Sequence, residues 1–284
     1  MEIGTGLKIF SKENPSKYID VGIAEEHAVT YAAGLAAAGK KPLVVLYSTF
    51  FQRAYDQVLH DVLLQKLPVI FCLDRAGLVG PDGPTHHGVF DISMLNSFPN
   101  IIISAPKDGA ELSNLIYTAI ETRKVFAIRY PKGNCEKFNP NNGQQLLEVG
   151  KWEILSSGQD IAILAVGSMV TICMNIKDTL EQKLGHKITI VNALYVKPLD
   201  SKLLNELANN HTTIFTVEEG ALIGGFGSSV LQYFSNNDIN VKVFNKGIGD
   251  VFIQHGTRDE LMAIAGLDED SLINYIEGKI LNDK

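Results

Sequence analysis

Short apolar runs alternate with helix-like segments along the first half of the chain. Unbroken runs rich in β-branched and aromatic residues are typical of strands buried on both faces of a sheet. Such runs predict strands at residues 18–21, 42–47, 67–73, 101–104 and 125–130. Apolar residues that recur every three or four positions predict helices at residues 22–38, 49–66 and 108–122.

The same alternation returns after a stretch rich in Pro, Gly, Lys and Asn. It predicts strands at residues 161–166, 188–193, 213–217 and 241–245, and helices at 169–184, 260–265 and 271–280. Alternating strands and helices favour parallel pairing. We therefore expect an α/β protein with two tandem domains, each a mainly parallel or mixed sheet flanked by helices. The expected division is residues 1–133, a linker at 134–148, and residues 149–284.

Composition narrows the class of protein. The 284 residues are 45% hydrophobic and carry a formal net charge of −7, without a basic cluster, so neither nucleic acid nor an anionic membrane surface is an expected partner. No apolar run approaches the roughly 20 residues of a membrane span. The three cysteines are far apart and have no CxxC spacing, which favours a reducing compartment. These features predict a cytoplasmic enzyme.

Several familiar motifs fail on inspection. Residues 34–41 nearly match a phosphate-binding P-loop, but Lys41 stands where a Ser or Thr hydroxyl is needed for Mg²⁺. A glycine near the end of a helix is more often a C-cap, and we interpret Gly39 in that way. His86 and His87 are adjacent, so in an extended loop their rings point apart and chelate one metal poorly.

Two segments resist a purely structural interpretation. Residues 21–30 place Glu25 where a predicted buried strand meets an Ala-rich helix. An acidic residue in the first turn of a helix can also simply interact favourably with the helix dipole. Composition alone favours that simpler interpretation. Residues 74–88 form a long Gly-rich loop after a buried strand, where open α/β sheets bind ligands. Arg75 and Arg129 each follow or end a predicted strand on the same expected rim, and two guanidinium groups there would suit a phosphate.

Taken together, these segments resemble one family. Residues 18–38, 47–57, 74–88 and 129–133 are similar to the C-terminal portion of the 1-deoxy-D-xylulose-5-phosphate synthases, which are thiamin-diphosphate enzymes of the transketolase superfamily. The resemblance covers essentially the whole chain and is looser in the second half. It implies a transketolase-like fold, with a pyrimidine-binding domain at residues 1–133 and a transketolase C-terminal domain at 149–284.

The resemblance also implies roles for cofactor-binding residues. Glu25 would hydrogen-bond the aminopyrimidine ring of thiamin diphosphate and act in catalysis, which reverses the simpler interpretation of this acid. A carboxyl group in an apolar site can share a proton with a ring nitrogen. Phe50 would stack on the pyrimidine ring, and Arg53 would lie close to the cofactor.

Substrate-binding roles follow from the same resemblance. The implied substrates are pyruvate, which loses CO₂, and glyceraldehyde 3-phosphate, in the biosynthesis of isoprenoid precursors and thiamin. Asp82 and His86 would act in catalysis, and Arg75 and Arg129 would grip the phosphate. The full implied set of acceptor-contacting residues is Tyr47, Arg75, Asp82, His86 and Arg129, whereas His87 receives no role.

One part of the family pattern is missing from the sequence. No Gly-Asp-Gly…Asn motif, which holds the diphosphate and Mg²⁺ in the family, occurs here. We therefore expect the Mg²⁺ ligands to lie on a separate diphosphate-binding domain or subunit. The opening helix and first strand that the resemblance implies for the pyrimidine-binding domain are missing too, so we expect that domain to be truncated at its N-terminus. The chain alone should lack synthase activity, and the family suggests a homodimer.

Two other functions stay open. A β-type subunit of a 2-oxoacid dehydrogenase, or of a split transketolase, would use the same Glu25, and the dehydrogenase subunit should not need the phosphate grip of Arg75 and Arg129. A non-catalytic assembly module that kept the scaffold would not depend on Glu25 for activity.

Overall fold

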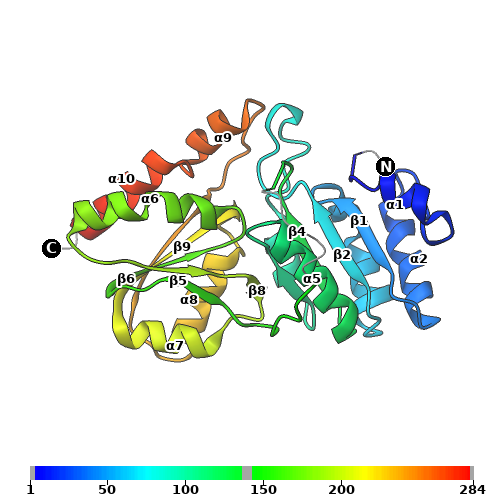
Figure 1. Cartoon of the computed structure of the whole chain (residues 1–284), viewed down its shortest axis with the longest axis horizontal. Helices are drawn as coiled ribbons and strands as arrows, with labels where there is room; N and C mark the ends of the chain where they lie inside the picture. Colours follow the sequence, from blue (N-terminus) through cyan, green and yellow to red (C-terminus); the bar gives the residue numbers. More distant parts are fainter. Residues whose placement is uncertain (1–3, 136–142, 282–284) are drawn as a thin grey trace.

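Each half of the chain is built around its own five-stranded sheet, and the two sheets lie side by side in the computed structural model, which describes residues 4–135 and 143–281 (Figure 1). The first sheet has the order β1-β2-β4-β3-β8 and the second β10-β9-β6-β7-β5. Pairing is parallel except for β8 in the first sheet and β5 in the second. The strands are β1 (Leu43–Tyr47), β2 (Ile70–Asp74), β3 (Ile102–Ser104), β4 (Phe126–Tyr130), β5 (Glu153–Ser156), β6 (Asp160–Ala165), β7 (Thr189–Asn192), β8 (Tyr195–Lys197), β9 (His211–Ala221) and β10 (Lys242–Ile248). The predicted α/β class, with two mainly parallel or mixed sheets, is confirmed.

Helices cover both faces of the sheets, as expected when strands are buried on both sides. In the second half, α6 and α10 lie on one face and α7 and α8 on the other (Figure 1). The α-helices are α1 (Lys8–Glu13), α2 (Glu25–Ala37), α3 (Tyr55–Gln57), α4 (Asp91–Asn96), α5 (Gly109–Thr122), α6 (Met169–Leu184), α7 (Ser201–Asn210), α8 (Phe226–Asn236), α9 (Arg258–Ala265) and α10 (Glu269–Leu281). The remaining helical segments are η1 (Pro15–Lys17), η2 (Phe50–Ala54), η3 (Val58–Leu63) and η4 (Gly80–Asp82).

The structure corrects parts of the predicted element list. Residues 18–21 are not a strand: Ile19 is exposed, and the Asp20 carboxylate accepts the N–H of Gly22 in a local turn. The predicted helix at 49–66 is a succession of 3₁₀, α and π segments instead of one α-helix. The sequence analysis missed α1, α4, α7, α8, β5 and β8.

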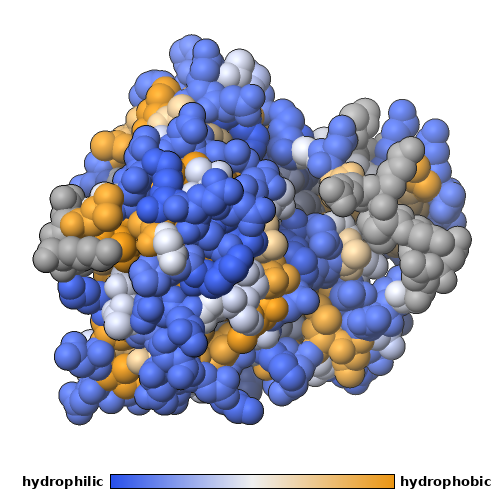
Figure 2. All heavy atoms as spheres, turned by 60° about the vertical axis from the view of Figure 1, so that its left-hand side comes forward, coloured by the Kyte–Doolittle hydropathy of each residue, from blue (hydrophilic) through white to orange (hydrophobic). Residues whose placement is uncertain are grey.

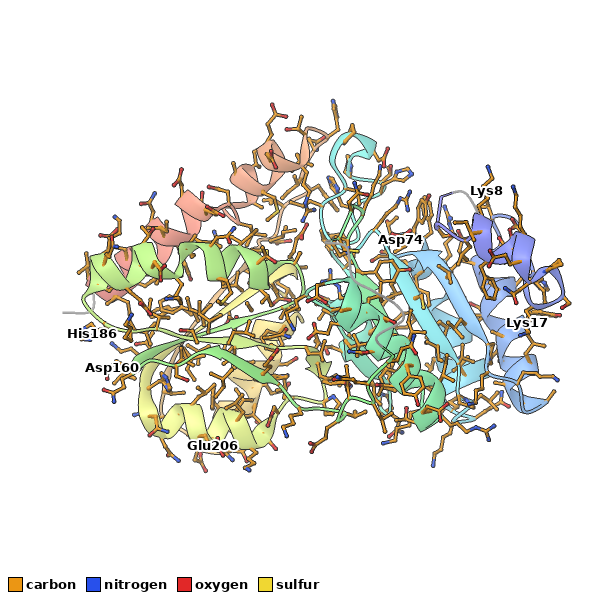
Figure 3. The ribbon with its side chains drawn as sticks, viewed as in Figure 1. Lys8, Lys17, Asp74, Asp160, His186 and Glu206 are labelled. Atoms are coloured by element: carbon orange, nitrogen blue, oxygen red, sulfur yellow. The ribbon has the colours of Figure 1, made fainter. Side chains whose placement is uncertain are left out.

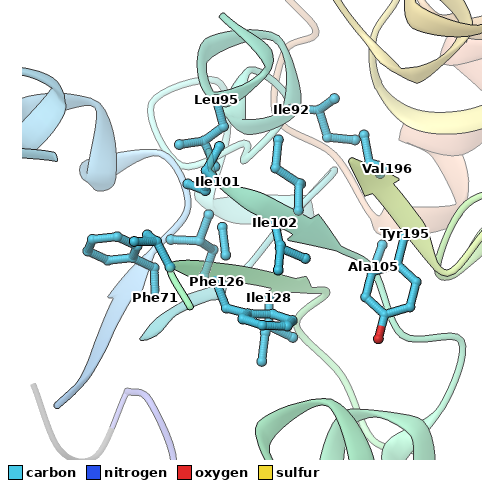
Figure 4. Close-up of a cluster of buried hydrophobic side chains, with 14 of the residues drawn as sticks. Phe71, Ile92, Leu95, Ile101, Ile102, Ala105, Phe126, Ile128, Tyr195 and Val196 are labelled. Atoms are coloured by element: carbon cyan, nitrogen blue, oxygen red, sulfur yellow. The ribbon is translucent and has the colours of Figure 1, made fainter. Parts of the chain in front are cut away.

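Strand β8 joins the two halves of the molecule. It comes from the second half of the chain but pairs antiparallel with β3 at the edge of the first sheet. Its residues Tyr195 and Val196 are buried in the same core as Phe126 and Ile128 of β4, and Tyr195 lies beside Ala105 (Figure 4). The first core is therefore completed by a segment beyond the predicted linker. Residues 136–142 of that linker lie outside the described residues, and the predicted domain boundaries stay a prediction.

The register of the first sheet brings three strand ends together. Tyr47 of β1 pairs with Asp74 of β2, and Asp74 pairs with Tyr130 of β4. Parallel strands share one carboxyl edge, and open α/β sheets bind ligands beyond that edge. The segments that follow β1, β2 and β4 in the chain therefore begin next to one another at this edge of the sheet.

The surface is mixed in character. The face seen in Figure 2 is mainly hydrophilic, with smaller apolar areas between the polar ones. This is the usual pattern for a protein surface, on which scattered apolar side chains are normal. Among the residues that the structure describes, no helix has the length and apolar character needed to cross a membrane.

Candidate active site

Five predicted site residues gather at the carboxyl edge of the first sheet. Tyr47 ends β1, and the chain turns directly into η2, which carries Phe50 and Arg53. Arg75 follows β2, whose last residue, Asp74, lies at the upper end of the strands in Figure 3. His86 reaches the same place from the Gly-rich loop, as its contact with Phe50 shows.

Aromatic rings and guanidinium groups form the body of this cluster. The rings of Tyr47 and Phe50 are nearly parallel with centroids 5.7 Å apart, and His86 meets the Phe50 ring edge-on at 5.2 Å. The Arg53 guanidinium lies 4.8 Å from the centre of the Phe50 ring, and that of Arg75 lies 3.7 Å from the Tyr47 ring. In such cation–π contacts, the guanidinium group is attracted to the face of the aromatic ring.

Glu25 begins α2 and is buried, with 3% of its surface exposed, whereas the neighbouring Glu26 is exposed. An acid that only complemented the helix dipole would have no need to leave solvent. Its Oε1 lies 3.1 Å from Nη1 of Arg53, whose side chain is half exposed. The burial expected for Glu25 is thus found, and Arg53 links this carboxylate to the Phe50 ring.

Arg75 is held firmly at the end of β2. Its backbone has a φ of +62°, in the left-handed region that non-glycine residues seldom adopt. Its Nη1 donates to Oδ2 of Asp74 and to the carbonyl oxygen of Gly4, at 2.7 and 2.8 Å. Burial raises the pKa of Asp74 despite the opposing charge of Arg75. The guanidinium therefore has a fixed orientation beside Tyr47.

Asp82 and His86 lie on the Gly-rich loop. Asp82 forms an ion pair with Lys132 at 3.0 Å, and both side chains are partly exposed. The hydrogen bond from Lys132 is the main cause that lowers the pKa of Asp82. His86 Nδ1 lies 2.9 Å from the Thr85 hydroxyl. Both groups are thus accessible in a way that their buried neighbour Glu25 is not.

Arg129 departs from its predicted place. It was expected on the open rim with Arg75, but only 5% of its surface is exposed. Its Nε donates to Oδ2 of Asp91 at 2.9 Å, and one Nη donates to the carbonyl oxygens of Gly88 and Glu219, at 3.4 and 3.0 Å. The reason is the buried Asp91 carboxylate, which needs a charged partner. As found, Arg129 ties β4 to the loop and to β9.

Several residues that contact Asp82, Arg129 or the Gly-rich loop received no role in the sequence analysis. Lys132 lies within the segment 129–133 but received no role. Asp91 of α4 accepts from Arg129, and Glu219 of β9 accepts from the loop residue Leu78. His87 bridges Val79 to Gln254. An acidic pair at residues 218–219, at the end of a predicted strand, was the one available signal for Glu219.

In the part of the chain that the structure describes, no metal site marks this cluster. Within residues 4–135 and 143–281, no group of three His, Cys, Asp or Glu side chains could hold a metal ion. A cavity of about 710 Å³ lies elsewhere, between the α5 and α7 regions, with Glu111, Trp152 and Asn192 in its lining and none of the predicted site residues. The candidate site is therefore defined here by its side chains.

Family models match most of the chain. The model described as the transketolase pyrimidine-binding domain matches residues 1–137, and the model of the transketolase C-terminal domain matches residues 150–272. Among solved structures, a split-gene transketolase titled an inactive β4 tetramer superposes with a TM-score of 0.85 and 28% identity. It covers 95% of this chain and 86% of its own.

Curated relatives are more similar in sequence. The 1-deoxy-D-xylulose-5-phosphate synthase of Aquifex aeolicus is 50% identical over 272 residues, which cover 96% of this chain and 43% of the relative. That of Halothermothrix orenii is 48% identical over 274 residues, again 96% of this chain and 43% of the relative. The chain thus spans less than half of the length of the curated relatives it matches.

Proposed function

The chain belongs to the transketolase superfamily, and from this premise we propose that it forms the pyrimidine-binding and C-terminal part of a 1-deoxy-D-xylulose-5-phosphate synthase. The complete enzyme would join a two-carbon unit from pyruvate, with loss of CO₂, to glyceraldehyde 3-phosphate. The product would enter the biosynthesis of isoprenoid precursors and thiamin.

The observation that carries this proposal is the burial of Glu25 against Arg53, whose guanidinium also lies over the Phe50 ring. A buried carboxylate with a single arginine partner, next to an aromatic face, suits a nitrogen heterocycle that stacks and exchanges a proton. The pyrimidine half of thiamin diphosphate therefore fits the residues present. Its diphosphate and Mg²⁺ would be held by a separate domain or subunit; within the described residues, no group of three His, Cys, Asp or Glu side chains could hold a metal ion.

When bound, thiamin diphosphate supplies an electron sink for the carbon that loses CO₂. The role of this chain would be to hold and orient the aminopyrimidine ring. Arg53 engages Oε1 of Glu25, so we expect Oε2 to hold or release the proton shared with the aminopyrimidine ring. Phe50 would present its ring face, and Arg53 would keep the carboxylate in place.

The acceptor would meet the exposed part of the cluster. Arg75, fixed by Asp74 against the Tyr47 ring, would bind the phosphate of glyceraldehyde 3-phosphate. His86 and Asp82 would bind the aldehyde and its developing alkoxide, and His86 would act in proton transfer. Arg129 is enclosed and paired with Asp91, so its proposed phosphate contact would require it to leave that partner.

We propose further that the chain alone is inactive and works with a diphosphate-binding domain or subunit, in a homodimeric or larger assembly. The split-gene transketolase of similar span is, by its title, inactive as a β4 tetramer. Its likeness over 95% of this chain supports the proposal that a chain of this span needs a complement. The same likeness makes a split transketolase the alternative function.

The test is an assembled enzyme, in which this chain is combined with the N-terminal portion of the Aquifex aeolicus relative. We expect release of CO₂ from pyruvate that depends on glyceraldehyde 3-phosphate, thiamin diphosphate and Mg²⁺. Glu25→Gln should lower the rate at least roughly 100-fold, as expected for loss of a proton-transfer group. Glu26→Gln is the matched control and should retain the rate.

Different outcomes separate the alternatives. An assembled enzyme that prefers a ketose phosphate donor would indicate a transketolase, and one that acylates a lipoyl group would indicate a dehydrogenase subunit. An assembly that is equally active with Glu25→Gln would mean that this chain is only a scaffold. Turnover by the chain alone would contradict the proposed need for a complement.

A further inference from the structure

Glu219 belongs to the C-terminal half of the chain but reaches into the Gly-rich loop. It lies near the end of β9 and has only 1% of its surface exposed. Its Oε1 accepts the backbone N–H of Leu78 at 2.7 Å. Arg258 at the start of α9 donates to both carboxylate oxygens at 2.8 Å, and the Ser168 hydroxyl adds a bond to Oε2 at 2.7 Å. A buried carboxylate is tolerated when it is paired in this complete way.

Arg258 completes the hold on the same loop residue. Its Nη1 donates to the carbonyl oxygen of Leu78 at 2.6 Å, so both backbone polar groups of Leu78 are bound by the Glu219–Arg258 pair. The Leu78 side chain is buried in the core of the C-terminal half, with Phe215 and Leu261. This part of the loop is therefore anchored to the second half of the chain and not to its own sheet.

The backbone shape of the loop matches this carboxylate. Gly77 has a φ of +80°, and a Cβ atom built there would lie 2.4 Å from the Glu219 carboxylate. Only glycine fits between the loop and the acid. Figure 1 shows the loop, in cyan, beside the segment that leads into α9, in orange.

A second anchor holds the far end of the loop. His87 is buried, its Nδ1 accepts the N–H of Val79, and its Nε2 must then donate to the carbonyl oxygen of Gln254, both at 3.2 Å. A Cβ atom on Gly83 would lie 3.2 Å from the His255 side chain. The loop is thus attached to the C-terminal half both before and after Asp82.

We propose that Glu219 and Arg258 are positioning residues, through which the C-terminal domain sets the place of Asp82 and His86. Among the described residues, neither side chain of the pair hydrogen-bonds to Asp82 or His86, although the backbone carbonyl of Glu219 accepts from Arg129. We therefore expect the pair to act on Asp82 and His86 through the loop backbone. This inference rests on the proposed function for the identity of the acceptor, but the anchoring itself is independent of it. A displacement of about 1 Å in such groups can lower a rate by roughly 100-fold.

The test combines a readout of the loop with a readout of the reaction. Arg258→Lys keeps the charge but cannot bind both carboxylate oxygens, and Arg123→Lys at the exposed end of α5 is the matched control. In the isolated chain we expect the Leu78 and Val79 amides to exchange hydrogen at least tenfold faster in Arg258→Lys. The β6 amides should exchange as before, which shows that the fold persists.

In the assembled enzyme, Arg258→Lys should raise KM for glyceraldehyde 3-phosphate roughly tenfold or more and change KM for pyruvate less than twofold. The double variant Glu219→Gln with Arg258→Gln keeps hydrogen-bonding groups but removes both charges. Its KM for glyceraldehyde 3-phosphate should lie between those of Arg258→Lys and the unmodified chain. Unchanged exchange at Leu78 and Val79 would overturn the anchoring. Faster exchange with equal changes in both KM values would overturn the positioning role. An inert assembled enzyme would contradict the proposed function, while the exchange result would still decide the anchoring.

Discussion

Nη1 of Arg53 lies 3.1 Å from Oε1 of Glu25, and it joins a carboxylate that is buried to a guanidinium that is half exposed. The pair connects the first turn of α2 with η2, two segments that the sequence separates by 28 positions. Arg53 also covers the ring of Phe50. One arginine therefore fixes the relation between the proposed proton-transfer group and the proposed stacking surface.

Phe50→Leu tests the stacking surface. The change keeps an apolar side chain but removes the ring face, so the affinity of the assembled enzyme for thiamin diphosphate should fall roughly three- to tenfold, as expected for loss of one aromatic contact. Equilibrium dialysis measures it directly. Phe252→Leu, at an exposed aromatic residue in the loop after β10, should leave the affinity unchanged. Equal affinities for the unmodified and Phe50→Leu enzymes would place the cofactor elsewhere.

Asp91→Asn tests the buried pairing of Arg129. The change keeps the shape of the side chain but leaves a buried guanidinium without its counter-charge, which typically costs about 3–5 kcal/mol of unfolding free energy. Urea denaturation of the isolated chain measures this value. Glu148→Gln, which removes an exposed pair with Lys151, should cost less than about 1 kcal/mol. A cost below about 1 kcal/mol for Asp91→Asn would mean that Arg129 is free to serve a ligand.

Glu218 should make stability depend on pH. Burial raises its pKa to about 7, against two backbone N–H donors from the start of α8 that favour the charged form. Because the pKa of Glu218 is raised in the folded chain, the contribution of this group to the free energy of unfolding is fully present below the unfolded pKa near 4.5. That contribution is lost as pH rises through about 7. The loss should approach about 3 kcal/mol at most.

The measurement is the free energy of unfolding at pH 5 and pH 8, for the unmodified chain and for Glu218→Gln. The substitution should remove most of the decrease in the free energy of unfolding between pH 5 and pH 8. Glu206→Gln, at an exposed residue of α7, serves as the control and should leave that decrease in place. A pH dependence that Glu218→Gln leaves intact would show that another group titrates.

Lys132→Met should raise the pKa of Asp82. The hydrogen bond from Lys132 is the largest cause of its lowering, so without it the pKa should return toward the ordinary value of 3.8. Carboxyl NMR titration measures the change. Since the folded pKa of Asp82 is lowered, its contribution is present above the unfolded value and is lost as pH falls through the folded value. Lys124→Met, at an exposed lysine, should not shift Asp82; a pKa that is unchanged in Lys132→Met would refute the pairing.

Local patterns predicted much of the scaffold. The apolar runs at 42–47 and 67–73 became β1 and β2, and the predicted rim does carry Tyr47 and Arg75. The failures have physical reasons. Residues 18–21 have strand-like composition, but Asp20 accepts the N–H of Gly22 in a local turn. Strand β8 has only three residues and pairs with β3 at the edge of the first sheet.

By itself, the sequence determined the alternation of strands and helices, and thereby which residues stand where parallel strands end. Those properties follow from hydrophobic period and turn chemistry, which act over a few neighbouring residues. Only the tertiary structure decided that Arg129 turns to Asp91, 38 positions away, and that Glu219 binds Leu78 across 141 positions. A buried charge takes whichever partner packing brings within reach, and no local pattern encodes that choice.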